Sequence, residues 1–143
     1  MGVIRTNYIF IIAGVLSLLC LAAIAQTADR PADLNDEASR IKDIIDNESA
    51  YHDKWIVIEG KIATECPGGC WFVVDDESAK IFVTMGPNNF TIPKKTGSVV
   101  RVFGNVTDAK AEEVHGNYVL KEGMAYMIGK ILEIGGTIYR GTF

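Results

Sequence analysis

The sequence predicts a mainly β domain, a small closed barrel of five strands, and three observations lead to it. From residue 54 onward, apolar residues recur with a period of two, as in strands with one buried face. Polar and proline- or glycine-containing turns divide this region into five segments. Gly60 and Gly104 stand in the middle of two of them, where glycine suits a strand that bends or bulges at the corner of a closed barrel.

The five strands and their order follow from these segments. The similarity between residues 57–62 (VIEGKI) and 101–106 (RVFGNV) fits strands one and four of a five-stranded Greek-key barrel of the OB type. The turn at 75–78 joins the second and third strands in a hairpin. Strands are expected at 55–62, 70–74, 80–85, 99–106 and 125–134, with a further short segment at 118–120.

One short amphipathic helix is expected before the barrel, over residues 34–46. Apolar residues recur there at helical spacing, with Asp33 or Asn35 available as N-cap: Leu34, Ala38, Ile41 and Ile45. The segment 86–98 carries two prolines and two asparagines, which favour a loop over the helix that many OB-folds have there. The preceding helix is therefore expected to cap the barrel.

The N-terminus is typical of an export signal. Residues 8–24 are uncharged, Arg5 stands in front of them, and the small residues Ala23 and Ala25 suit cleavage before Gln26. The apolar run is close to the ~20 residues of a membrane span, so an uncleaved signal anchor is the alternative. We expect an extracytoplasmic protein, in the periplasm, at the cell surface or secreted. Its parts are a signal or anchor (1–25), a linker (26–33), the OB-fold domain with its helix (34–135) and a C-terminal tail (136–143).

The charge of the chain disfavours nucleic acid as a partner. Without residues 1–25, the chain carries 13 Lys and Arg against 18 Asp and Glu, a net charge of −5. No run of cations is longer than Lys94-Lys95. An acidic domain without a basic patch repels a phosphate backbone.

Three Asn-x-Ser/Thr sequons offer glycosylation sites in an exported chain, at Asn47, Asn89 and Asn105. Plain polar surface residues are the competing interpretation for each of them.

Cys66 and Cys70 flank a Pro-Gly-Gly turn between the first two strands. Positions on either side of so short a hairpin loop come within disulfide range, and export favours oxidation, so we expect a disulfide that staples the hairpin. A metal site with His115 is the second interpretation, which for a soft ion such as Cu(I) would add a methionine. A redox dithiol is the third, although Cys-x₃-Cys is not the Cys-x-x-Cys of thioredoxin-like proteins.

These motifs resemble a family of exported OB-fold domains with no assigned function, over roughly residues 40–135. Family members have a strand ending in Gly-x-Val, a cysteine pair followed by Trp, an aromatic-x-x-Pro stretch before Gly, and a Val-x-Val-x-Gly strand. In the family one more residue usually separates the cysteines. The matching segments here are Gly60-Lys61-Ile62, Cys66, Gly69-Cys70-Trp71, Phe90-Thr91-Ile92-Pro93, Gly97 and residues 100–104. The resemblance implies the barrel and export, and no activity.

A weaker resemblance is to the haem chaperone of cytochrome c maturation. That family combines an N-terminal anchor, an OB-type barrel, and a reactive His followed by a Tyr near the last strand. Here His115 is followed by Tyr118, a closer spacing than in that family. The resemblance implies a metal- or haem-handling protein that uses Cys66, Cys70 and His115.

No local catalytic motif stands out, so the sequence favours a non-catalytic binding or assembly module without a cofactor. Its partner would be an unknown ligand or protein, and nucleic acid is the least favoured. OB-folds stack ligands on exposed aromatic rings. The candidate ligand-binding residues are Trp71, Phe90 and Tyr118, on the barrel surface and beside the loop at 86–97. Filling of the barrel core is the competing role for each aromatic residue.

Overall fold

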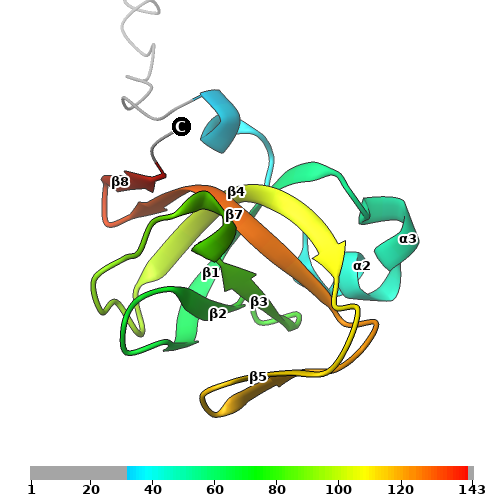
Figure 1. The fold of residues 1–143 in the computed structure, drawn as a ribbon. Helices are drawn as coiled ribbons and strands as arrows, with labels where there is room; N and C mark the ends of the chain where they lie inside the picture. Colours follow the sequence, from blue (N-terminus) through cyan, green and yellow to red (C-terminus); the bar gives the residue numbers. More distant parts are fainter. Residues whose placement is uncertain (1–31, 142–143) are drawn as a thin grey trace, which may run out of the picture.

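The computed structural model of the protein describes residues 32–141, and their backbone forms a closed barrel (Figure 1). The main sheet has six strands in the order β3-β2-β1-β4-β7-β8. Their bounds are β1 (Trp55–Glu65), β2 (Trp71–Asp75), β3 (Lys80–Thr84), β4 (Val99–Asp108), β7 (Ala125–Ile134) and β8 (Thr137–Arg140).

The barrel closes where β3 pairs with β7, and this pairing is parallel whereas the others are antiparallel. β1 and β4 pair from Trp55 opposite Asn105 to Lys61 opposite Val99, as expected for the first and fourth strands. The five predicted barrel strands are all present, and the predicted fold class of a five-stranded OB-type barrel is confirmed.

The two mid-strand glycines stand where neighbouring backbone comes very close. The register of β4 against β7 shifts between Phe103 and Gly104, and a β-carbon on Gly104 would lie 2.5 Å from the Ile128 carbonyl oxygen. A β-carbon on Gly60 would lie 2.5 Å from the Asp75 carbonyl oxygen, near the point where β1 passes from β4 to β2. Gly104 therefore stands at an irregularity of the ladder, as the sequence predicts, and at both glycines a side chain would meet the backbone of the neighbouring strand.

The predicted helix over 34–46 is wrong for its first half. Residues Ala32–Asn35 form a 3₁₀ turn (η2), and the α-helix is confined to α2 (Ile41–Asp46), followed by α3 (Glu48–Tyr51). Ala38 forms a β-bridge with Val57, so the chain between η2 and α2 is extended against β1. The Arg101 guanidinium also donates to the carbonyl oxygens of Leu34 and Asp36, so these two oxygens serve the barrel instead of a helix.

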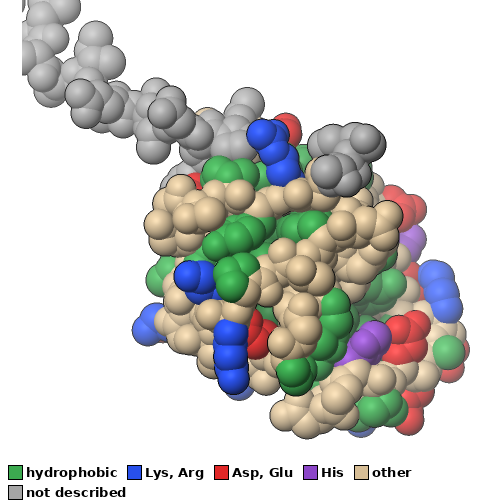
Figure 2. Space-filling view, turned by 60° about the vertical axis from the view of Figure 1, so that its left-hand side comes forward, with side chains coloured by type: hydrophobic (Ala, Val, Ile, Leu, Met, Phe, Trp, Pro, Cys, Tyr) green, Lys and Arg blue, Asp and Glu red, His purple; other side chains and the backbone are tan. Residues whose placement is uncertain are grey.

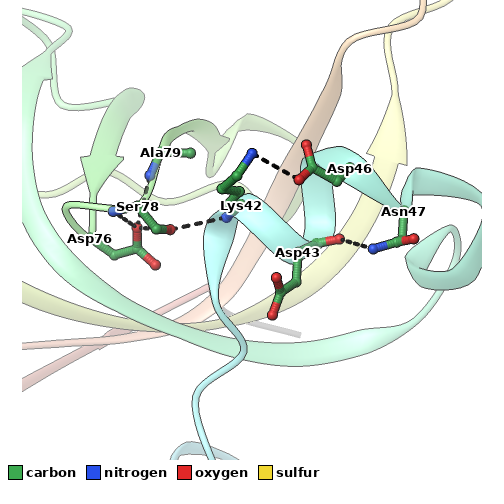
Figure 3. A network of polar contacts seen from close by, with 7 residues as sticks. All are labelled: Lys42, Asp43, Asp46, Asn47, Asp76, Ser78 and Ala79. Atoms are coloured by element: carbon green, nitrogen blue, oxygen red, sulfur yellow. Dashed lines mark hydrogen bonds and ion pairs between the residues drawn. The ribbon is translucent and has the colours of Figure 1, made fainter.

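The N-terminus of α2 is capped from another part of the chain. Its N-cap residue makes no side-chain cap, and neither predicted cap (Asp33 or Asn35) stands at that position. Instead the backbone N–H of Ile41 donates to Asp76 Oδ2 at 2.9 Å, and that of Lys42 donates to Ser78 Oγ at 3.1 Å. Figure 3 shows the turn between β2 and β3 holding the first turn of this helix.

The main core fills the barrel and includes one side of α2. Ile41 and Ile44 of the helix are fully buried and pack in one cluster with barrel residues, so α2 covers the barrel as expected. Tyr51 and Phe90 pack against the same cluster. The barrel residues of this cluster include Ile58, Ile62, Phe72, Val74, Ile81, Val83, Met85, Val100, Val102, Val106, Met127 and Leu132.

Two connections and the C-terminal segment complete the fold. After β3 comes a 3₁₀ turn, η3 (Gly86–Asn88), and an irregular loop without an α-helix, as predicted. Between β4 and β7 lies a hairpin of β5 (Glu113–His115) and β6 (Tyr118–Leu120), which Figure 1 shows projecting from the barrel. The predicted tail contains β8, which pairs with β7.

The predicted signal or anchor lies outside the residues that the structure describes. Within residues 32–141, no helix is long and apolar enough to cross a membrane.

Candidate functional site

A second apolar cluster lies on the outer surface of β2 and β3. Because side chains alternate along a strand, Phe72 and Val74 point into the barrel while Trp71 and Val73 point outward. Val73 and Trp71 are nevertheless buried, because the connection between β4 and β7 covers them. The buried members of this cluster are Trp71, Val73, Phe82, Ala109 and Leu120, and we call it the aromatic face.

Phe82 stands at the centre of the aromatic face. Its ring centroid lies 5.3 Å from that of Trp71 and 5.2 Å from that of Tyr118, which stacks on it. The His115 ring lies 4.8 Å away, and Tyr126 approaches edge-on at 6.4 Å. Two of these rings, His115 and Tyr118, come from the β5–β6 hairpin, so side chains fill the space beneath its ribbon.

OB-folds bind oligonucleotides and oligosaccharides on this same side, at strands two and three and the loops beside them. Here the hairpin covers part of that surface: Phe82 is 1% exposed and Trp71 6%. Tyr118, Tyr126 and His115 keep partial exposure at the edge of the cluster. The solvent-facing part of the site is therefore formed by their rings.

The two tyrosines are neutral acids held in an apolar setting. Burial raises the pKa of Tyr118. Burial also raises the pKa of Tyr126, and the nearby carboxylates of Glu113 and Asp108 raise it further. Both hydroxyls are therefore protonated at neutral pH and available as hydrogen-bond donors.

The loop of Cys66 and Cys70 borders the aromatic face, and the rest of the chain fixes it. Cys66 N–H donates to the Trp71 carbonyl at 2.9 Å, and Met85 N–H donates to the Cys70 carbonyl at 3.0 Å. Gly69 has a φ of +72°, and its carbonyl accepts from Ile92 N–H at 3.0 Å. Both cysteines pack against the aromatic face, so loop and face form one site.

The two cysteines are free thiols whose Sγ atoms lie 2.9 Å apart, with Cys70 donating to Cys66. This hydrogen bond lowers the pKa of the Cys66 thiol against the smaller effect of its burial, and the N–H groups of Cys70, Gly68 and Gly69 lower it further. Burial, followed by the hydrogen bond to Cys66, raises the pKa of the Cys70 thiol. The pair is therefore asymmetric, with the thiolate favoured on Cys66.

His115 lies on the aromatic face, at the hairpin. Its ring centroid lies 6.4 Å from that of Trp71, and its Nε2 lies 3.1 Å from Glu113 Oε2. Among the described residues, the group of three metal-ligating side chains whose atoms lie within 4.8 Å of one another is a different one, Glu48, His52 and Asp108. The Lys110 ammonium pairs with one member of this group, at 2.8 and 3.0 Å from the two Asp108 carboxylate oxygens.

The structure brings two of the three predicted ligand-binding residues together. The ring centroids of Trp71 and Tyr118 lie 6.3 Å apart on the aromatic face, whereas Phe90 packs against the core of the barrel. The loop of Phe90 nonetheless lies beside the cysteine loop through Ile92. Glu65 fixes its far end by accepting from the N–H groups of Lys95 and Thr96.

The three sequon asparagines lie apart from one another. Asn47 and Asn89 are exposed, at the end of α2 and after η3, while Asn105 is half-buried within β4. Asn47 Nδ2 donates to the Asp43 carbonyl at 3.2 Å (Figure 3).

Two further surface features lie away from this site. Trp55 is 51% exposed and stacks on Phe103 at 5.4 Å, with the Lys130 ammonium 5.1 Å from its ring centroid. A groove of about 530 Å³ between the β1–β2 region and residues 97–99 is lined by several acidic side chains, including Glu59, Asp75, Asp76 and Glu77.

Figure 2 shows hydrophobic side chains gathered across one side of the molecule, with a histidine and acidic side chains beside them.

The sequence did not single out Tyr126 or Phe82 as part of the site. A signal for Phe82 exists in the sequence: residues 81–83 are three consecutive apolar residues, as in a strand that is covered on both faces. The structure buries all three of them. Tyr126 could be assigned only through the parallel pairing of β3 with β7, which places it opposite Phe82.

The chain matches no protein-family model and no curated protein.

Proposed function

We propose that the protein is an exported, non-catalytic OB-type binding module whose ligand binds at the aromatic face. The observation that carries this proposal is the set of rings from β2, β3, β7 and the β5–β6 hairpin on the side where OB-folds bind ligands. The cysteine loop on one side and the hairpin on the other would bound the ligand. Disulfide formation between Cys66 and Cys70 belongs to the same proposal.

The charge and the rings favour a neutral oligosaccharide over a nucleic acid. Glu113 and Asp108 place negative charge near Tyr126, and the exported part of the chain has a net charge of −5. A phosphate backbone would meet repulsion there, whereas a sugar ring can stack on Tyr118 and accept from the tyrosine hydroxyls.

Fluorescence of Trp71 tests the proposal, in a Trp55→Phe variant so that Trp71 is the single emitter. The emission is expected to change and saturate on titration with a neutral oligosaccharide such as chitohexaose. A Tyr118→Ala variant should lose this saturable change while its folding, checked by circular dichroism, is retained. No saturable change with any of a panel of neutral oligosaccharides would reject this ligand class.

The Trp55→Phe variant also distinguishes sugar binding from the least favoured alternative, nucleic-acid binding. A single-stranded oligothymidylate at physiological salt is expected to leave the Trp71 emission unchanged. A saturable change with the oligothymidylate, with none for sugars, would assign the face to nucleic acid instead.

A metal- or haem-handling function is the second candidate, since Cys66, Cys70 and His115 all border the aromatic face. Elemental analysis and the absorption spectrum of protein purified from its native compartment test this function. Stoichiometric metal or haem that is lost in Cys70→Ser would support it over the sugar-binding proposal.

A further inference from the structure

We propose that Cys66 and Cys70 form a thiol–disulfide exchange site, in which Cys66 attacks a disulfide and Cys70 resolves the mixed disulfide. The co-substrate would be the disulfide of a small thiol or of an exposed peptide. This proposal rests on the proposed disulfide between the two cysteines and is independent of the ligand of the aromatic face.

The geometry of the loop suits a pair that is made and broken repeatedly. The two sulfurs already lie 2.9 Å apart as thiols, so a bond between them requires a displacement of less than 1 Å. Hydrogen bonds from Met85 and Ile92, on the segment after β3, hold the carbonyls of Cys70 and Gly69. The backbone of the loop can therefore stay in place in both redox states.

The approach to Cys66 is open. Both cysteines are half-buried, but Pro67 and Gly68, which follow Cys66, are exposed, whereas Gly69 and Trp71, on either side of Cys70, are buried. A β-carbon built on Gly68 would meet only the Cys66 sulfur, at 3.9 Å. A disulfide can therefore reach Cys66 over the small residues of the turn.

The local hydrogen bonds distinguish the attacking cysteine from the resolving one. Cys70 donates its proton toward Cys66, and the N–H groups of Cys70, Gly68 and Gly69 also favour a thiolate on Cys66. The thiolate is the nucleophile in thiol–disulfide exchange, so Cys66 is the attacking residue. Burial, followed by the hydrogen bond to Cys66, raises the pKa of the Cys70 thiol, which suits the later, resolving step.

The exchange conserves atoms and electrons. The Cys66 thiolate attacks one sulfur of the co-substrate disulfide, a mixed disulfide forms, and the first co-substrate thiolate leaves. Cys70 then loses its proton to solvent, and its sulfur attacks Cys66 Sγ. The bond to the co-substrate breaks, and the second thiolate leaves. Two protein thiols are oxidised to one disulfide while the co-substrate disulfide is reduced to two thiols, and the reaction can run in reverse.

Positional labelling tests which thiol attacks. The full chain carrying Cys20→Ser, so that Cys66 and Cys70 are its two cysteines, is reduced and treated with less than one equivalent of iodoacetamide. Tandem mass spectrometry is expected to find the first label predominantly on Cys66. Equal labelling of the two cysteines would overturn the assignment.

Reaction with glutathione disulfide tests the second step. The Cys20→Ser protein should release two glutathione molecules and accumulate little mixed disulfide. Cys70→Ser in that background keeps a hydroxyl donor beside Cys66 and should retain one glutathione at Cys66. Cys66→Ser should react at Cys70 at least about tenfold more slowly, because the attacking thiolate is absent. Circular dichroism of each variant establishes that it is folded.

The outcomes separate this inference from the proposed disulfide. A pair that oxidises but reacts equally fast in both single-serine variants would leave a structural disulfide and overturn the exchange site. A pair whose two thiols stay free with excess glutathione disulfide would overturn both. Sugar binding at the aromatic face is tested separately, by the fluorescence of Trp71.

Discussion

The carbonyl oxygen of Ile92 occupies the place that a side chain at Gly69 would need. A β-carbon built on Gly69 would lie 1.9 Å from that oxygen, and the residue has a φ of +72°. The Ile92 N–H donates to the Gly69 carbonyl, so the loop after β3 is fixed to the cysteine loop at this point. Any side chain at residue 69 must therefore separate the two loops.

Gly69→Ala is expected to lower the free energy of unfolding by about 2–4 kcal/mol, because a strained backbone and a steric clash add. Urea unfolding followed by circular dichroism measures this loss. Gly68→Ala is the matched control, since a β-carbon there meets only the Cys66 sulfur at 3.9 Å, and a loss of less than about 1 kcal/mol is expected. Equal losses would contradict the close approach.

The two tryptophans are expected to differ strongly in their contribution to stability. Trp71 is 6% exposed and packs on Phe82, so Trp71→Ala should lower the free energy of unfolding by about 3–5 kcal/mol. Trp55 is 51% exposed, and Trp55→Ala should lower the free energy of unfolding by about 1 kcal/mol or less. Urea unfolding of both variants checks the contrast, and a small loss for Trp71→Ala would mean that the hairpin does not cover it in solution.

The barrel itself could be predicted because its signals are local. The alternation of apolar residues located the strands, and Gly104 located the irregularity of the ladder between β4 and β7. The failure at residues 34–40 has the opposite cause. Leu34 and Ala38 have helical spacing, but Arg101 and the β-bridge to Val57 use that backbone for contacts with the barrel.

The candidate site was predictable only in part for the same reason. The Cys66–Cys70 loop and Trp71 are contiguous in sequence, so their association could be read directly. Tyr118 and Phe82 are far apart in sequence and stack only because the β5–β6 hairpin returns over β3. Phe90 and Ile92 lie in the same loop and both pack with the main core, a long-range contact that no local pattern in the sequence indicates.

Arg101 is expected to hold the segment before α2 on the barrel, and lysine cannot replace it. Its Nε donates to the Leu34 carbonyl at 2.6 Å, its Nη1 to Glu59 at 3.0 Å, and its Nη2 to the Asp36 carbonyl. The ammonium of lysine lacks this planar fork. Arg101→Lys should lower the free energy of unfolding by about 1–3 kcal/mol and increase amide exchange at Ser39, which donates to the Val57 carbonyl.

Arg140→Lys is the control for this substitution, because Arg140 is exposed on β8. A change within about 0.5 kcal/mol is expected for it. An Arg101→Lys protein with unchanged amide exchange at Ser39 would show that the bridge to β1 alone holds the segment.

Asp76 is expected to make the stability of α2 depend on pH. Its Oδ1 accepts from Ser78 N–H and Oγ and from Ala79 N–H, and its Oδ2 accepts from Ile41 N–H (Figure 3 shows the contacts with Ser78 and Ala79). Burial alone would raise the pKa of this carboxyl, but the hydrogen bonds outweigh it and the pKa is lowered. A folded-state pKa below the unfolded value adds stability above about pH 4, and this stability is lost as the pH falls through the folded-state pKa.

Asp76→Asn removes both the charge and one acceptor, because the amide nitrogen must face a backbone N–H on one side of the turn. The free energy of unfolding should therefore fall at pH 7. The difference from the unsubstituted protein should shrink as the pH falls below about 4, where the carboxyl of the unfolded chain gains a proton, and should be smallest below the lower folded-state pKa. Urea unfolding at a series of pH values measures the difference, and amide exchange at Ile41 reports the loss of the cap. Asp46→Asn, which removes an exposed pair with Lys42, should lower stability by about 0.5 kcal/mol or less. A difference for Asp76→Asn that stays constant down to pH 3 would mean that the turn, and not its ionised carboxylate, holds the helix.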